Sequence, residues 1–192
     1  MSRSSSPKPP RNPRSSNSNK IEAFENMASR LEHLEVTHVG KRYQVVMHAV
    51  MQTSADRAYA VFTDYARLVQ INPAIIQAVP IDGALAPAQR VHTQVRVCVM
   101  GICRVFDQVQ DMYKEPPQHL RAEVIPEMSN LKFGRASWRI WDEGEEARLI
   151  FEAVVEPDFW VPPIIGPWLI ERKLASEAVH TAEGIERLAN AR

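Results

Sequence analysis

Alternating apolar and polar residues along the chain predict a series of β-strands. From Arg42 to Gln52 every second residue is apolar, which is the period of a strand with one buried face. Turn-forming residues such as Gly83, Pro116-Pro117 and Glu143-Gly144 separate the later segments. We therefore expect an antiparallel meander with further strands near 77–83, 89–99, 102–114, 119–126, 133–142 and 146–156.

Apolar residues at three- and four-residue steps predict helices in the remaining segments. Ser54 is a suitable N-cap for a helix that begins at Ala55, and Asn72-Pro73 ends it, because the residue before a proline is pushed out of the helical region. A short second helix is expected around 74–77. Pro167 fits the first position of a long helix to the C-terminus, whose apolar stripe is Ile170, Leu174, Ala178, Ala182 and Ile185.

An upstream stripe predicts one more short amphipathic helix. It consists of Ile21, Phe24, Met27, Leu31 and Leu34. This helix would either pack on the domain or engage a partner, and residues 21–38 are interpreted as helix and linker before a domain that spans 39–192.

The order of the predicted elements is one strand, two short helices, six strands and one long helix. The apolar stripe of the long helix needs a large partner surface, which the concave face of a curved antiparallel sheet would supply. The stripe continues to Leu188 or Ala189, so three of its positions (Ala178, Ala182 and Ala189) are alanine, and either the sheet comes close or space remains between helix and sheet. The sequence thus predicts an α+β fold of about seven strands around a C-terminal helix, with room for a cavity.

The order of elements and two segments resemble the START / polyketide cyclase / SRPBCC superfamily, which has the helix-grip fold. The segments are ADRAYAVFTDYARLVQINPAI and PDFWVPPIIGPWLIERKLASEAVHTAEGIERLA, and they are similar to the bacterial cyclase-dehydrase and coenzyme Q-binding START-like branch. The resemblance covers about residues 42–190. It implies a cavity for lipids, quinones or other apolar molecules but not one particular activity.

Aromatic and aliphatic residues are the candidates for the cavity wall. The alternation in FGRASWRIW places Trp138 on an apolar face, and the next strand places Phe151 on its apolar side. The full set of candidate cavity residues is Trp138, Phe151, Phe106, Trp160, Trp168, Ile170, Leu174 and Ala178.

Charged residues occupy the opposite face of the same strands. Arg139 and Glu152, with Arg121 and Glu123 on the preceding strand, predict a solvent-facing ladder of cross-strand pairs, each contributing about 0.2–1 kcal/mol. The alternative points Arg139 and Glu152 into the cavity to orient a polar group. We expect these charged residues to face the solvent as a ladder of cross-strand pairs, because the opposite face of the strands is apolar and is needed for the core.

The stretch EPDFWVPPIIGPWLIERKL connects the last strand to the long helix and is rich in aromatic residues and proline. Its Phe159, Trp160 and Trp168 either pack as a corner of the core or form an exposed rim. An exposed rim over residues 159–168 would gate the cavity or make transient membrane contact.

Cys98 and Cys103 lie opposite each other across the hairpin at Met100-Gly101, close to disulfide reach. Without a visible export signal we expect them to be free thiols, the disulfide being the alternative. No metal-ligand spacing, nucleophile motif or phosphate-binding glycine loop occurs, so we expect no catalytic residue, metal or cofactor.

Composition and charge narrow the partners and the compartment. Residues 1–20 hold five Lys/Arg and no acidic residue in a chain of net charge zero, so the remainder carries a net −5 and offers no broad basic field for nucleic acid. The same segment, rich in Ser and Pro, is expected to be disordered, with an organelle transit peptide as the alternative. No signal peptide or membrane span is visible, which favours the cytoplasm and leaves organelle or periplasm open.

Two functions follow from these expectations. The first is binding or transport of an apolar lipid, isoprenoid or quinone-like molecule without catalysis. The alternative is a cyclase/aromatase-like enzyme, for which Arg139, Glu123, Glu152 and Tyr65 are the acid/base candidates.

Overall fold

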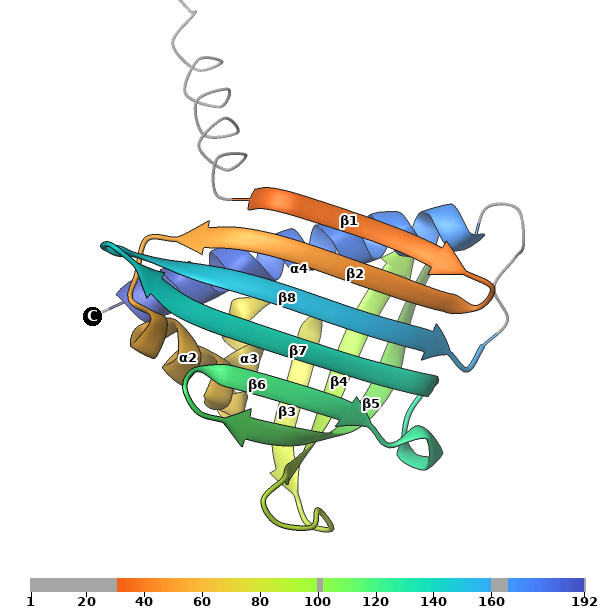
Figure 1. Cartoon of the computed structure of the whole chain (residues 1–192). Helices are drawn as coiled ribbons and strands as arrows, with labels where there is room; N and C mark the ends of the chain where they lie inside the picture. Colours follow the sequence, from red (N-terminus) through yellow and green to blue (C-terminus); the bar gives the residue numbers. More distant parts are fainter. Residues whose placement is uncertain (1–30, 100–101, 160–165, 192) are drawn as a thin grey trace, which may run out of the picture. The chain divides into compact units, whose positions relative to one another are not determined.

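A single antiparallel sheet curves around a long helix in the computed structural model, which describes residues 31–99, 102–159 and 166–191 (Figure 1). Eight strands form the sheet in the order β1-β2-β8-β7-β6-β5-β4-β3. Their bounds are Leu31–Val39 (β1), Arg42–Met51 (β2), Ile75–Ile81 (β3), Gln89–Val99 (β4), Ile102–Glu115 (β5), His119–Val124 (β6), Leu131–Glu143 (β7) and Glu146–Pro157 (β8). The α+β class, the curved antiparallel sheet and the enclosed C-terminal helix are confirmed.

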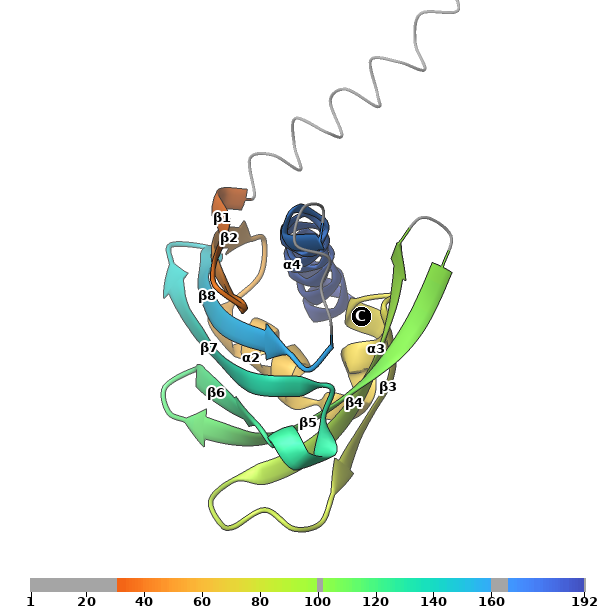
Figure 2. The same cartoon turned by 90° about the vertical axis from the view of Figure 1, so that its right-hand side faces the viewer.

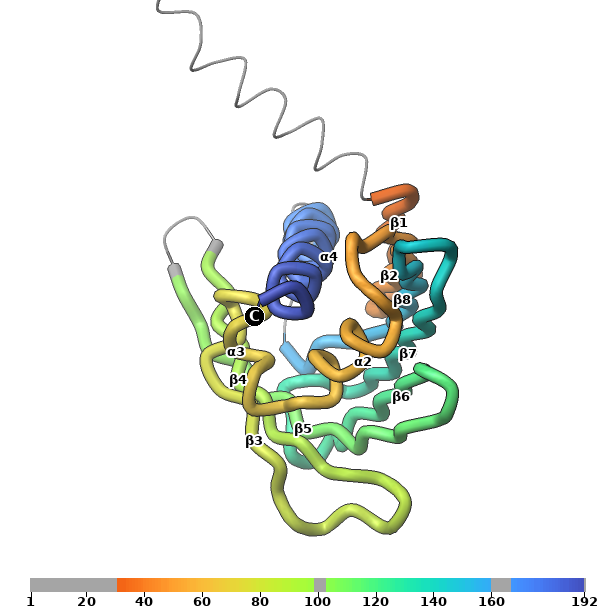
Figure 3. Tube along the Cα trace, turned by 90° about the vertical axis from the view of Figure 1, so that its left-hand side faces the viewer, coloured from red at the N-terminus to blue at the C-terminus, as the bar shows by residue number. Residues whose placement is uncertain are grey.

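The helices cover the concave face of the sheet. They are α2 (Ala55–Thr63), η1 (Tyr65–Arg67), α3 (Leu68–Ile71) and α4 (Gly166–Asn190), with a further 3-10 turn, η2 (Pro126–Met128), between β6 and β7. Figure 2 shows α4 lying within the curve of the sheet, and Figure 3 shows α2 and α3 beneath α4 at the end where the chain finishes.

Local capping explains where α2 begins. The Ser54 side chain accepts a hydrogen bond from Arg57 N, as predicted for an N-cap. Asp142 on β7 accepts a second bond, 2.7 Å long, from Ala55 N. A carboxylate at a helix N-terminus satisfies an otherwise free N–H and complements the helix dipole. The two caps fix α2 against the sheet.

Two predicted helical segments are strands. Leu31 and Leu34, expected in the helix and linker of residues 21–38, belong to the edge strand β1, which makes the sheet one strand larger than predicted. The short helix expected around 74–77 is also wrong, because β3 begins at Ile75 and the second short helix is α3. Residues 1–30 lie outside the described part, so the tail and the helix over 21–30 stay predictions.

Cys98 and Cys103 are paired across β4 and β5 and joined by a disulfide with a Cα–Cα distance of 4.0 Å. The expectation of free thiols is therefore wrong, and the alternative holds. Opposed positions in an antiparallel pair bring the Cβ atoms close enough for the bond, whatever the loop between them.

None of the helices in the described ranges is long and apolar enough to cross a bilayer.

Candidate functional site

The long helix packs on one side of the concave sheet. Its main packing partners are β1, β2, α2 and α3. On that side the inner residues of β2, such as Tyr43, Val45 and Met47, are buried. The remaining inner wall, formed by β8, β7, β6, β5 and β4, passes below α4 and rises again on its other side (Figure 2).

The inner face of that wall contains both buried and half-buried residues. Leu149 and Ile140, paired near the end of α4, are buried in one core with α2 and α4, and Leu120, the partner of Trp138, belongs to the same core. Toward the start of α4, the inner residues Phe151, Trp138, Ala136, Phe106 and Val95 are only half-buried. Core packing is therefore less complete at these half-buried positions than at the buried ones beside them.

Trp138 and Phe151 lie inside the sheet as predicted. They are paired across β7 and β8, with ring centroids 5.2 Å apart, and Phe62 of α2 lies 6.0 Å from Trp138. Aromatic pairs at this spacing stabilise each other beyond the area they bury. These three rings stand where the buried core meets the half-buried part of the wall.

The other candidate residues divide between two places. Ile170 and Leu174 are half-buried on the first turns of α4, and Ala178 is buried in the core. Phe106 stacks with Phe159 at 5.1 Å, while Trp168 is 56% exposed and lies beside Arg172. Trp160 lies outside the described residues. The structure therefore leaves Phe106, Ile170 and Leu174 half-buried and Trp168 on the surface.

A polar group on the inner face was missed by the sequence patterns. Thr93 pairs with Gln108, and Gln108 Nε2 donates a 2.8 Å hydrogen bond to Gln110 Oε1, two residues along the same face of β5. The register places these residues on the face of Val91 and Met112, which belong to the core. An uncharged polar group therefore stands within an otherwise apolar wall.

The charged residues of the central strands lie on the convex face. Arg121 Nη1 lies 2.7 Å from Glu123 Oε1, Arg135 lies 3.6 Å from the same carboxylate oxygen, and Arg139 lies 3.3 Å from Glu152. The ladder interpretation is confirmed, and the alternative of Arg139 and Glu152 in a cavity is wrong. Arg139, Glu152 and Glu123 consequently face away from the concave side.

Tyr65 is the acid/base candidate that is buried inside. Its hydroxyl has no hydrogen-bond partner, and burial raises the pKa of Tyr65 to about 12, with a smaller contribution from Tyr59. Desolvation disfavours the phenolate, so the hydroxyl stays protonated at neutral pH. In this state it can donate a hydrogen bond but is a poor base.

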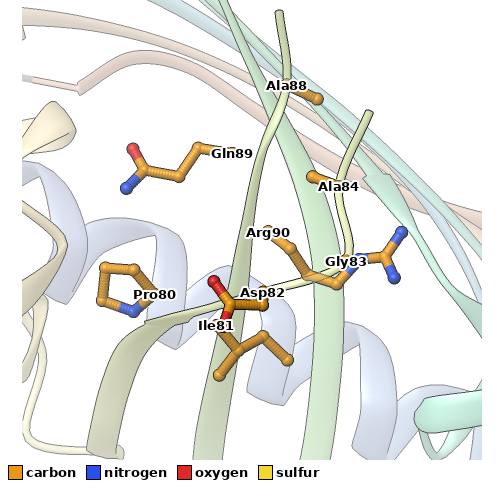
Figure 4. A pocket seen from close by; sticks show the side chains of 8 residues that line it. All are labelled: Pro80, Ile81, Asp82, Gly83, Ala84, Ala88, Gln89 and Arg90. Carbon is orange, nitrogen blue, oxygen red and sulfur yellow. The ribbon is translucent and has the colours of Figure 1, made fainter. Parts of the chain in front are cut away.

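A separate pocket of 290 Å³ lies at the connection of β3 and β4 (Figure 4). Its lining includes Ile81, Gly83 and Arg90. Arg90 is held by Asp111 in a bidentate pair, with N–O distances of 2.7 and 2.9 Å, on the convex face. The Arg90 guanidinium is therefore already paired, and Asp82 and Gln89 supply the other polar side chains of the pocket.

Within the described ranges, no group of three or more His, Cys, Asp or Glu side chains is arranged to hold a metal ion.

These features define a START-like helix-grip fold. Solved structures with the same fold include a START superfamily protein from Mycobacterium smegmatis, with 16% identity, a TM-score of 0.60 and coverage of 75% of this chain and 94% of that one. The Zhui aromatase/cyclase from Streptomyces sp. R1128 has 14% identity and a TM-score of 0.58, with 77% and 93% covered. A STAR-related lipid transfer protein from Xanthomonas axonopodis has 11% identity and a TM-score of 0.61, with 82% and 99% covered.

No protein-family model matches the sequence, and no curated protein matches it. At the identities above, the similarity to solved structures concerns the fold.

Proposed function

We propose that the protein binds an apolar small molecule, such as a lipid, an isoprenoid or a quinone-like compound, between the sheet and the first half of α4. The observation that supports this proposal is the half-buried inner wall at Trp138, Phe151 and Phe106, together with half-buried Leu174 on α4. Side chains of this kind gain free energy when an apolar ligand removes their remaining surface from water, at about 25 cal/mol per Å². One similar structure is a lipid transfer protein, which agrees with this class of ligand.

Native mass spectrometry of the protein purified from cells tests the proposal. We expect co-purified apolar molecules that leave the protein when it is unfolded. Protein that carries none, and that also fails to take up fluorescent fatty acids and quinones, would contradict the proposed function.

Ala136→Leu tests where the ligand binds. Ala136 is half-buried on the inner face of β7, so a larger side chain is expected to fill the ligand space and abolish binding with little change in stability. The matched control is Ala122, the cross-strand partner of Ala136 on β6. Ala122 is 1% exposed and lies in the packed core. Ala122→Leu is expected to lower the free energy of unfolding by about 1–3 kcal/mol, because overpacking strains a filled core. Equal destabilisation by both variants would mean that no space exists at Ala136.

The alternative of a cyclase/aromatase-like enzyme has less support. One similar structure is an aromatase/cyclase, but three of the four acid/base candidates of this chain form the convex ladder. The enzyme proposal then depends on Tyr65, whose raised pKa makes it a donor rather than a base. Binding is the function that the arrangement of side chains favours.

Transient membrane contact is proposed for the rim at Phe159 and Trp168, which are 44% and 56% exposed. Exposed aromatic side chains partition into the bilayer interface, and Arg172 beside the Trp168 ring adds a positive charge for anionic lipid. Trp168→Ala is expected to weaken co-sedimentation with anionic vesicles roughly tenfold, given the apolar area lost.

Trp141→Ala is the matched control, because Trp141 is 40% exposed on β7 away from the rim. The control should bind vesicles like the unmodified protein. Equal binding by the two variants would rule out a membrane-contact role for Trp168.

A further inference from the structure

The polar group on the inner wall, Thr93, Gln108 and Gln110, has hydrogen-bonding capacity that the protein leaves unused. Thr93 is 6% exposed, yet its hydroxyl oxygen has no hydrogen-bond partner. A buried hydroxyl without a partner costs about 1–3 kcal/mol relative to a satisfied one. Such a group calls for an explanation, and a hydrogen bond from this hydroxyl to a bound ligand is one that can be tested.

The two glutamines add donors and an acceptor beside that hydroxyl. Gln108 faces Thr93 across β5 and β4, and its Nε2 group donates to Gln110 Oε1. That bond leaves the Gln108 carbonyl oxygen as an acceptor and the Gln110 Nε2 group as a donor. A ligand group at this position would meet both a donor and an acceptor.

The neighbours of this group on the same face are uncharged. Along the strands and across them they are Val91, Val95, Ala78, Phe106, Met112 and Val124. An ionised carboxylate or phosphate placed here would lose its hydration without gaining a counter-ion, which is strongly unfavourable. A neutral hydroxyl or carbonyl would lose little and gain two or more hydrogen bonds.

We propose that Thr93, Gln108 and Gln110 bind the neutral oxygen-bearing end of the ligand, so that the preferred ligands are apolar molecules with a terminal hydroxyl or carbonyl rather than an ionised head. This inference rests on the proposed function and specifies its ligand class. The half-buried aromatic wall at Phe106 adjoins the polar group on β5 and would contact the apolar part of the same molecule.

Ligands with one chain length and different ends test the proposal. Cetyl alcohol, palmitate and hexadecane are compared in competition with a fluorescent apolar probe bound to the full-length protein at neutral pH. We expect the alcohol to bind more tightly than hexadecane by about fivefold for each hydrogen bond gained, and more tightly than palmitate.

Thr93→Val removes the hydroxyl and keeps the shape of the side chain. It is expected to reduce the preference for cetyl alcohol over hexadecane about fivefold, while the melting temperature stays the same or rises, because an unsatisfied buried group is lost. Thr53→Val is the matched control: Thr53 is 5% exposed, also has an unpartnered hydroxyl, and lies between β2 and α2. The control should leave the ligand preference unchanged.

The outcomes separate this inference from the proposed function. If hexadecane and cetyl alcohol bind with equal affinity, and Thr93→Val changes neither affinity, the inference is wrong. The proposed binding of apolar molecules then still stands. Tighter binding of palmitate than of the alcohol also overturns the inference. If none of the three ligands displaces the probe and none binds, the proposed function and the inference fail together.

Discussion

Gly184→Ala is expected to lower the free energy of unfolding by about 2–3 kcal/mol, although alanine is the better helix former. Gly184 lies inside α4, where alanine would normally add about 1 kcal/mol of stability. A Cβ atom at this position would stand 1.9 Å from the carbonyl oxygen of Ile71 and 2.6 Å from its carbonyl carbon. Because backbone atoms cannot turn aside as a side chain can, α3 and α4 would have to separate.

The thermal midpoint measures this effect. A loss of about 2–3 kcal/mol in the free energy of unfolding lowers the thermal midpoint by about 4–12 °C in a domain of this length. His180→Ala is the control on the same helix. His180 is exposed, so its replacement by alanine changes only the helix propensity, which it raises. A midpoint for Gly184→Ala equal to or above that of the unmodified protein would show that the close approach of the two helices is not rigid.

Strand positions in the second half of the chain could be predicted because turn residues mark every connection. The expected strands at 89–99, 119–126 and 146–156 agree with β4, β6 and β8 to within two residues at each end. Glycines at positive φ, such as Gly83 and Gly144, occupy the tight turns. Alternation then placed Trp138 and Phe151 on the correct face, since each of these strands has one clearly apolar side.

The two errors in secondary structure have one physical cause. Leu31 and Leu34 both face inward on β1, and a bulge between Leu31 and His33 turns the usual two-residue step into three. A three-residue apolar step is also the signature of a helix. A second bulge, between Ile75 and Gln77 on β3, disturbs the alternation where the short helix was expected.

The polar group of the candidate site could not be predicted for a different reason. Along β5 both faces mix apolar and polar residues: Phe106, Gln108 and Met112 share the inner face, whereas Val109 and Asp111 lie on the other. Val109 is buried although it faces outward, and Ser129, next to η2, bonds to its backbone. Alternation alone therefore does not identify the inner face of this strand; pairing with β4 and β6 does.

The helix α4 is anchored firmly at one end. Gly184 touches the backbone of α3, Asn190 donates a hydrogen bond to the Gln52 carbonyl, and Arg187 donates one to the Gln70 carbonyl. At the other end, His38 of β1 pairs with Glu171 of α4, and both side chains are partly exposed. Local opening should therefore start at the first turns of α4, next to the half-buried wall where a ligand would enter.

Asn72→Asp is expected to lower the free energy of unfolding by about 3–5 kcal/mol at neutral pH, because it places a carboxylate at the anchored end of α4. Asn72 is 3% exposed, and its Nδ2 group donates to the Glu177 carbonyl oxygen and to Thr181 Oγ1, at 3.3 and 3.2 Å. Its Oδ1 accepts a 2.8 Å bond from Ala74 N, which turns the chain into β3. The substitution keeps this last bond but turns a donor into a charged acceptor that faces a carbonyl oxygen.

The pH dependence distinguishes the buried charge from the lost hydrogen bonds. Burial raises the pKa of the introduced carboxyl in the folded state above its unfolded value of about 4. The charge penalty is therefore absent below about pH 4, grows between pH 4 and the raised folded-state pKa, and is constant above that pKa. Asn72→Ala removes the same donors without a charge, so its deficit relative to the unmodified protein, measured by urea unfolding, should not change with pH. Parallel pH profiles for the two variants would mean that the carboxylate reaches water, and that α4 is held less tightly on α3 than the hydrogen bonds of Asn72 indicate.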